Sequence, residues 1–272
     1  KSSYSISLGN THQDGIISST GMDRYNVKVS ADTKLTNNWS SGFTANYITT
    51  SIDKAVTSGN GLLRTVYAAP PSYDLAGIPS HVDGNPYTQN SFRGSFDNAY
   101  WAMDNNKFTE DTNRFFGNVY ASYQTDFGTT NHKLNAKYMV GVDAYTTHYV
   151  DSYGYGSNTG GGRGQIENYG WTNATYNSLL TINYDWHINE DWGLNAVLGN
   201  EIIQSNRKKY YEYGTNYNFP GWNHINNATT QQTEEETWKN RTVGFFGNVS
   251  ASYRNMLYLT LTGRQDYVSN MP

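Results

Sequence analysis

The sequence lacks three features that define common protein classes. It contains no cysteine, which excludes a disulfide framework and a thiolate metal site. Charged residues amount to only 15% and the formal net charge is −4, which is too small to indicate a nucleic-acid partner. The chain also has no run of about 18 apolar residues, and this excludes a membrane-spanning helix.

Aromatic and neutral polar residues are abundant instead. The 272 residues include 24 tyrosines, and tyrosine packs well on a pleated sheet. The mean hydropathy is −0.72, a value that a membrane barrel tolerates because lumen-facing residues and loops dilute the average. A transmembrane strand needs only about 9–11 residues, of which every second one is apolar. The composition therefore leaves strand-based membrane spanning open.

Alternation of apolar and polar residues is the dominant local signal. In the segment 132–145, Tyr138 and Val140 share one face of a predicted strand, whereas Lys137 and Asp143 share the other. A period of two is typical of a strand with one apolar face. The same pattern predicts nine strands, near residues 3–12, 22–35, 39–52, 112–126, 132–147, 169–188, 192–205, 241–254 and 257–268.

The connections between these strands alternate between short and long. A connection of medium length is expected at 13–21 and three long ones near 53–111, 148–168 and 206–240, whereas the short ones between them span only a few residues each. A soluble sandwich has no reason to place its short turns at one end, whereas a membrane barrel has tight turns on one side and long extracellular loops on the other. We therefore expect an all-β, antiparallel transmembrane β-barrel, of which residues 1–272 form a mid-to-late part.

Five aromatic residues lie within a few residues of the short turns and share the parity of the apolar face: Trp39, Tyr123, Trp186, Trp192 and Tyr253. Outward aromatics at one level are typical of a membrane girdle, where an amphipathic ring lies among lipid headgroups. The alternative is that aromatic residues simply favour strands.

Three blocks of residues resemble a known family. The first is Tyr4-Ser5-Ile6-Ser7-Leu8-Gly9-Asn10 with Gly15-Ile16-Ile17, and the second is Asn98-Ala99-Tyr100-Trp101. The third runs from Gly244-Phe245-Phe246-Gly247-Asn248-Val249 to Arg264-Gln265-Asp266. In order and spacing they resemble the SusC/RagA-type TonB-dependent transporters of Bacteroidetes outer membranes. The sequence departs from the family pattern at Ala99, where proline is common, at Asn248, often arginine, and at Tyr267, often glycine.

This resemblance implies a bacterial outer-membrane barrel of about 22 strands, closed by a plug that lies outside this chain. It further implies a SusD-like lipoprotein as a lid, TonB as the energy source, and active import of a sizeable nutrient, either an oligosaccharide or a peptide. Outer-membrane lipid would surround the barrel, and a dimer of the transporter–lid pair is compatible with this organisation.

Aromatic and charged residues of the predicted long connections are the candidates for substrate binding, because aromatic faces suit sugar rings and peptide side chains. They are Trp101, Tyr153, Tyr155, Arg163, Tyr217 and Trp222. The alternative is that these side chains pack the loops onto themselves or onto the lid protein.

The sequence predicts no catalytic site and no cofactor. No nucleophile lies in a recognisable pattern with a base, and the histidines show no metal-binding spacing. The acid run Glu234-Glu235-Glu236 is interpreted as a solvated loop face, with a calcium site in a loop as the alternative. The competing functions are an outer-membrane barrel enzyme, and a soluble secreted β-rich binding or adhesion protein.

Overall fold

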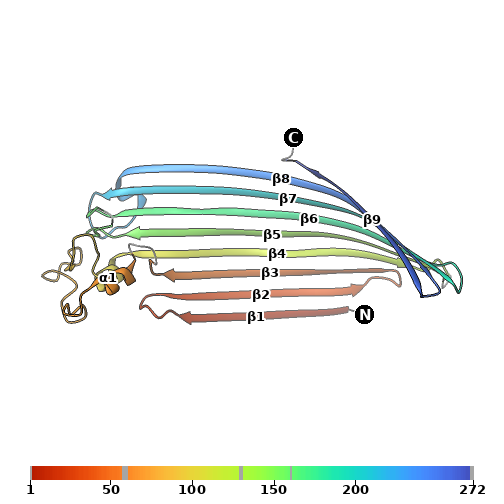
Figure 1. The fold of residues 1–272 in the computed structure, drawn as a ribbon, viewed down its shortest axis with the longest axis horizontal. Coiled ribbons are helices and arrows are strands. Elements are labelled where there is room, and N and C mark those ends of the chain that lie inside the picture. Colours follow the sequence, from red (N-terminus) through yellow and green to blue (C-terminus); the bar gives the residue numbers. More distant parts are fainter. Residues whose placement is uncertain (1, 57–60, 129–130, 160, 270–272) are drawn as a thin grey trace.

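A computed structural model describes residues 2–56, 61–128, 131–159 and 161–269. Nine antiparallel strands form one sheet in the order β1 to β9, so that every strand pairs with its neighbours in sequence (Figure 1). The elements are β1 (Ser2–Asp14), β2 (Gly21–Lys34), β3 (Trp39–Lys54), α1 (Leu62–Ala68), α2 (Ala99–Asn105), β4 (Lys107–Thr125), β5 (His132–Tyr153), β6 (Gln165–His187), β7 (Trp192–Tyr217), the 3₁₀ helix η1 (Ile225–Asn227), β8 (Ala228–Tyr253) and β9 (Leu257–Val268). The predicted all-β antiparallel class is confirmed.

Each pair of strands keeps one register along its length. The β7–β8 pair, for example, runs from Trp192 opposite Tyr253 to Tyr217 opposite Ala228 without a bulge. Directly opposed residues point to the same side of a sheet, and successive residues point to opposite sides. The registers therefore assign every strand residue to one of two faces across all nine strands.

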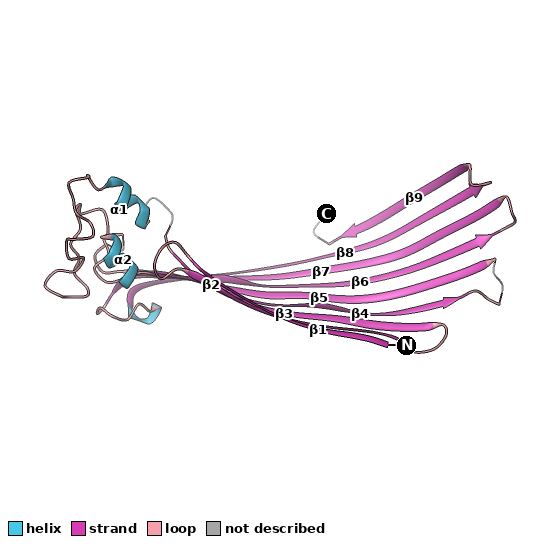
Figure 2. Ribbon diagram, turned by 90° about the horizontal axis from the view of Figure 1, so that it is seen from below, coloured by secondary structure: helices cyan, strands magenta, loops and turns pink. Residues whose placement is uncertain are grey.

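The sheet is a single, long and curved layer (Figures 1 and 2). Four connections of three to six residues lie at one end, between β2 and β3, β4 and β5, β6 and β7, and β8 and β9 (Figures 1 and 2). The connections 55–106, 154–164 and 218–227, with α1, α2 and η1, lie at the other end, as does the six-residue β1–β2 connection. The predicted clustering of tight turns at one end is thereby confirmed. None of the described helices is long and apolar enough to cross a lipid bilayer.

The six strands from β3 to β8 extend further toward the loop end than the alternation predicts. The connection expected at 206–240 contracts to 218–227, because β7 continues to Tyr217 and β8 begins at Ala228. Likewise the connection at 148–168 contracts to 154–164, and that at 53–111 to 55–106. In these extensions both faces carry polar and aromatic residues. The alternation of apolar and polar residues is therefore lost, although the hydrogen bonding between the strands continues.

The buried apolar residues lie at the loop end and not between the strands. One cluster holds Ile166, Tyr217 and Ala228, and Trp101 is completely buried within the 55–106 segment. By contrast, Val140 and Val249 in the strands are 37% and 44% exposed. The apolar residues of the strands therefore do not form the interior of a compact body.

Local capping explains how α2 places Trp101. The Asn98 side chain accepts hydrogen bonds from the Tyr100 and Trp101 amides at 3.0 and 3.3 Å, as an N-cap does. The Trp101 indole N–H donates to the Pro86 carbonyl at 2.9 Å. This bond satisfies the one polar atom of a fully buried side chain.

Candidate functional site

The two faces of the sheet differ sharply in the half that adjoins the short turns. One face, here called the apolar face, carries an apolar band; on β7 the band runs from Trp192 to Ile202. Ten residues of strand span about 33 Å, which projects to about 25 Å at the tilt of roughly 35–45° found in membrane barrels. This height equals that of the lipid-facing band of such barrels.

The five predicted girdle residues all lie on the apolar face next to short turns. Trp39 contacts Tyr123, with ring centroids 5.0 Å apart, and Trp192 contacts Tyr253 at 4.8 Å. Trp186 stacks on His132 across the β5–β6 pair at 5.7 Å. The structure thus places these rings at one end of the apolar band, and their contact with lipid headgroups stays a prediction.

The opposite face, here called the polar face, carries paired charges at the level of the apolar band. Arg114 forms a bidentate ion pair with Asp143 at 2.6 and 2.9 Å. Farther along the sheet, Arg264 bonds Glu201 at 2.8 Å. Charged groups arranged in this way require water or protein in front of them, because an isolated charge is costly in an apolar medium.

An aromatic wall lies on the polar face closer to the loops. It is formed by Tyr149, Tyr169, Trp171, Tyr211 and Trp238, which come from β5 to β8. Tyr149 and Tyr169 stack in parallel with centroids 4.8 Å apart, and Trp171 tilts against Tyr149 at 5.6 Å. Tyr211 lies beside Tyr169 at 6.4 Å. Such a surface offers broad apolar faces with polar edges to a ligand.

Charges of both signs border the aromatic wall. The Lys54 ammonium lies 4.5 Å from the centre of the Tyr149 ring and 3.5 Å from a Glu110 carboxylate oxygen. The Arg207 guanidinium lies between two indoles, 5.2 Å from Trp171 and 5.4 Å from Trp238. Cation–π contacts of this kind hold a charged head in a fixed place.

Two carboxylates face each other at the loop side of the wall. Asp151 and Glu167 are directly opposed in the β5–β6 register, and Asp151 accepts a hydrogen bond from the Tyr169 hydroxyl at 3.0 Å. Burial raises the pKa of the Glu167 carboxyl; a hydrogen bond from Tyr211 opposes this rise, and the Asp151 charge adds to it. Glu167 lies well beyond the apolar band. Because two carboxylates face each other here, this edge of the wall favours binding of a cation.

The six residues predicted to bind substrate fall into two groups. Trp101 and Tyr217 are fully buried and hold the loops together, which agrees with the loop-packing alternative. Tyr155 packs against the same cluster as Tyr217. The Arg163 guanidinium donates to the Tyr217 carbonyl at 3.1 Å, so the structure brings these two predicted residues together.

The other two predicted residues remain accessible. Tyr153 is half-buried and meets Phe108 edge to face at 5.2 Å, at the loop side of the aromatic wall. Trp222 is exposed at the tip of the β7–β8 connection and stacks with Phe219 at 5.8 Å and with His224 at 4.9 Å. A role of any of the six in substrate binding stays a prediction.

Sequence reasoning missed Trp171, Arg207 and Trp238. The alternation of apolar and polar residues places Arg207 and Trp238 in a loop, because it predicts that one strand ends at 205 and that the next begins at 241. Matching charges were the signal that could have extended the hairpin: Lys208 pairs with Glu235 at 2.9 Å, and Lys209 approaches Glu236 to 3.8 Å across β7 and β8.

The acid run therefore belongs to a strand and not to a loop, which corrects the interpretation from sequence. Adjacent strand residues point to opposite faces, so Glu235 lies on one face and Glu236 on the other. The three carboxylates consequently do not converge. Within the part of the chain that the structure describes, no group of three or more His, Cys, Asp or Glu side chains could hold a metal ion.

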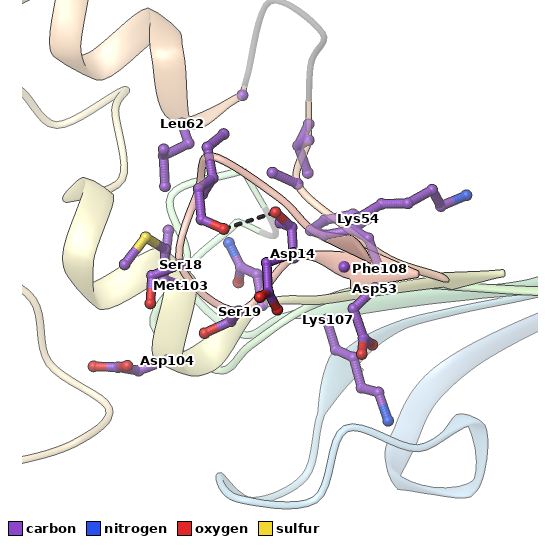
Figure 3. A pocket seen from close by; sticks show the side chains of 18 of the residues that line it. Asp14, Ser18, Ser19, Asp53, Lys54, Leu62, Met103, Asp104, Lys107 and Phe108 are labelled. Carbon is purple, nitrogen blue, oxygen red and sulfur yellow. Dashed lines mark hydrogen bonds between the residues drawn. The ribbon is translucent and has the colours of Figure 1, made fainter. Parts of the chain in front are cut away.

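A pocket of about 540 Å³ opens between the β1–β2 connection, the end of β3 and the 55–106 segment (Figure 3). Asp14, Asp53 and Asp104 line it together with Lys54 and Lys107. Of these residues, Lys54 lies on the polar face and contacts Tyr149, whereas Asp14, Asp53 and Lys107 lie on the opposite face of the sheet. The pocket is therefore largely separate from the aromatic wall.

No protein-family model and no curated protein matches this chain. Solved structures do match it. A structure described as the RagAB peptide transporter aligns over 100% of this chain with a TM-score of 0.74 and 13% identity. Two structures described as the RagAB peptide importer, in the "closed-closed" and "open-open" states, align over 98% with TM-scores of 0.75 and 0.77 and 15% identity.

The chain spans about a third of the length of these structures, since it covers 31%, 30% and 30% of their chains. At this identity the likeness concerns the fold alone. It confirms that the nine-stranded sheet has the architecture of part of a RagA-type barrel wall, as the resemblance in sequence predicted.

Proposed function

We propose that this chain forms part of the wall of an outer-membrane barrel that imports a sizeable nutrient. The observation that carries this proposal is the apolar band on one face of a single-layered sheet. Exposed apolar patches larger than a few hundred Å² are rare on soluble monomers and mark contact with a membrane or a partner. The fold shared with the RagAB structures supports the same interpretation.

The polar face, in this proposal, lines the path of the cargo. The long connections face outward from the cell, where a SusD-like lipoprotein covers them, and TonB supplies the energy for import. The 22-stranded closure and the plug belong to the proposal as well. Specificity comes from the loops and from the aromatic wall, and no covalent chemistry is involved.

Of the two cargo classes, a peptide fits the aromatic wall better than a neutral oligosaccharide. Glu167 and Asp151 provide negative charge at one place, and Arg207 provides positive charge farther along the wall. Glu167 and Asn173, which opposes Arg207, are six residues apart on β6, so the separation is about 20 Å. An extended peptide of about six residues with free termini has opposite charges at a similar spacing.

Two alternatives make different demands on the structure. A barrel enzyme needs a nucleophile and a base, or paired carboxylates, in reach of a substrate. A soluble adhesion protein buries one face of its sheet in a shared core. The paired carboxylates Asp151 and Glu167 are surrounded by tyrosines, an arrangement that suits binding of an amine.

The proposal is tested by locating the protein and measuring uptake in its own host. We expect the protein in the outer-membrane fraction, and fluorescent oligopeptides of five to ten residues (a range of about the wall's span) to enter wild-type cells but not deletion cells. A protonophore should abolish uptake, since TonB draws on the inner-membrane proton gradient. Recovery of the protein in the soluble fraction, or unchanged uptake after deletion, would contradict the proposal.

A further inference from the structure

Arg207 differs from its charged neighbours on β7. Lys208 and Lys209 each have a carboxylate partner on β8, at 2.9 and 3.8 Å. Among the described residues, by contrast, no carboxylate lies within ion-pairing distance of Arg207, although its side chain is held between Trp171 and Trp238. A guanidinium held between two rings has its N–H groups in a fixed orientation. It therefore loses little conformational entropy when it binds an anion.

A second donor lies directly beside Arg207. Asn173 opposes it in the β6–β7 register, on the same polar face. The Asn173 Nδ2 atom is buried and has no hydrogen-bond partner among the described residues. Buried donors are nearly always paired, so an unpaired one indicates a missing acceptor. Two adjacent groups, the exposed Arg207 guanidinium and the covered Asn173 amide, therefore have N–H donors for which the wall supplies no acceptor.

The position of the two donors suits contact with a solute in the lumen. The apolar band on β7 ends near Ile202, and Arg207 lies five residues beyond it, about 16 Å farther along the strand. Arg207 is exposed on the polar face, next to the aromatic wall. A cargo molecule entering from the loop end would meet this pair before it reached the level of the band.

We propose that Arg207 and Asn173 form a carboxylate subsite, in which the guanidinium binds both oxygens of a cargo carboxylate and the Asn173 amide, which neighbouring groups cover in this structure, reorients to donate to one of them. A planar guanidinium matches a carboxylate in a bidentate geometry. Trp171 and Trp238 flank the subsite and offer apolar contact to the carbon atoms next to the carboxylate. The subsite rests on the proposed import function and specifies which end of the cargo is recognised.

The test uses the complete transporter in detergent and two pairs of probes in calorimetric titrations. One pair is a hexapeptide with a free C-terminal carboxylate and its C-terminal amide. The other pair is an oligogalacturonide and its methyl ester, which distinguishes a sugar acid from a peptide carboxylate as the source of the anion. We expect the wild type to prefer a free acid over its neutral twin by about ten-fold or more in Kd, the size of a charge-assisted hydrogen bond.

The Arg207→Gln variant should lose this preference and bind the free acid and its neutral counterpart with equal Kd. Arg241→Gln is the matched control, because Arg241 lies on the neighbouring strand but on the apolar face, where it donates to Gln204 at 2.9 Å. The control should keep the preference. If Arg207→Gln does not fold, Arg207→Lys retains the charge without the planar fork, and its preference should fall by several-fold.

Two results would overturn the subsite: a wild type that binds acid and neutral probes equally, or an Arg207→Gln variant that keeps the full preference. Uptake separates these failures from failure of the import function. Cells that import peptides while Arg207→Gln changes nothing would refute the subsite and leave the transporter intact, whereas cells that import nothing would refute both.

Discussion

The two halves of the same strands follow different rules. In the half next to the short turns, apolar and polar residues alternate along β5 from Leu134 to Ala144, and each face has one character. In the half next to the loops, Tyr210 and Tyr211 on β7 point to opposite faces, and charges occur on both. The backbone pairing is the same in both halves.

This difference indicates where the surroundings of the sheet change. A strand alternates in hydrophobicity where its two faces meet different surroundings, an apolar one on one side and water on the other. Where water reaches both faces, each position is free to serve binding or loop packing. Three substitutions can break or sharpen this comparison.

The largest effect is expected from Trp101→Ala in the loop half. The indole is fully buried, so its removal should cost about 3–5 kcal/mol of the stability of the 55–106 segment. The change should appear as faster proteolysis of this segment, with the sheet unaffected. Tyr100→Ala on the same helix is the control, because Tyr100 is exposed. Equal sensitivity of the two variants would show that the loop has no core of its own.

A somewhat smaller effect is expected from Val140→Lys in the turn half. Val140 lies on the apolar face, near the middle of the alternating stretch of β5 from Leu134 to Ala144, where a lysine costs about 2–4 kcal/mol in a lipid bilayer. Thr172→Lys places the same charge on the same face beyond the band and should cost at most about 1 kcal/mol. Urea titration of both variants folded in vesicles measures the difference, and equal costs would refute the assignment of the band.

The smallest effect is expected from Glu235→Gln, which removes the exposed ion pair with Lys208. Exposed pairs contribute about 0.2–1 kcal/mol and are weakened by salt. Thermal melting at low salt should therefore drop slightly, and the drop should vanish at high salt. Glu190→Gln in the β6–β7 turn serves as the comparison. A loss that persists at high salt would mean that Glu235 stabilises the hairpin in another way than by charge.

Periodicity predicted the turn half of the fold well. Residues such as Val140 and Trp192 could be assigned to a face because apolar residues recur there at every second position. The extensions of β7 and β8 could not be predicted in the same way, since Arg207 and Trp238 stand in stretches without hydrophobic alternation. Their pairing depends on the hairpin tip at 218–227, and Pro220-Gly221 in this segment is a turn signal that could have located it.

The surroundings of the candidate site residues could be predicted only in part for a related reason. The sequence points to aromatic residues at the loop end, but it does not show which of them are buried, because burial depends on contacts far apart in sequence. Trp101 is enclosed because Pro86 and the Asn98 cap fold around it. Arg207 gains its two indole neighbours from β6 and β8, which only the register brings together.

The strictly sequential order of the strands has a consequence for how the sheet is assembled. Because each strand pairs with the one before it, the sheet can grow hairpin by hairpin, with no segment threaded past another. The β3–β4 hairpin is the exception, because its connection has roughly fifty residues. The entropic cost of closing such a loop is about 2 kcal/mol higher than that of closing a four-residue turn. Early ordering of the segment around α2 would shorten the effective loop and bring β4 to the edge of β3.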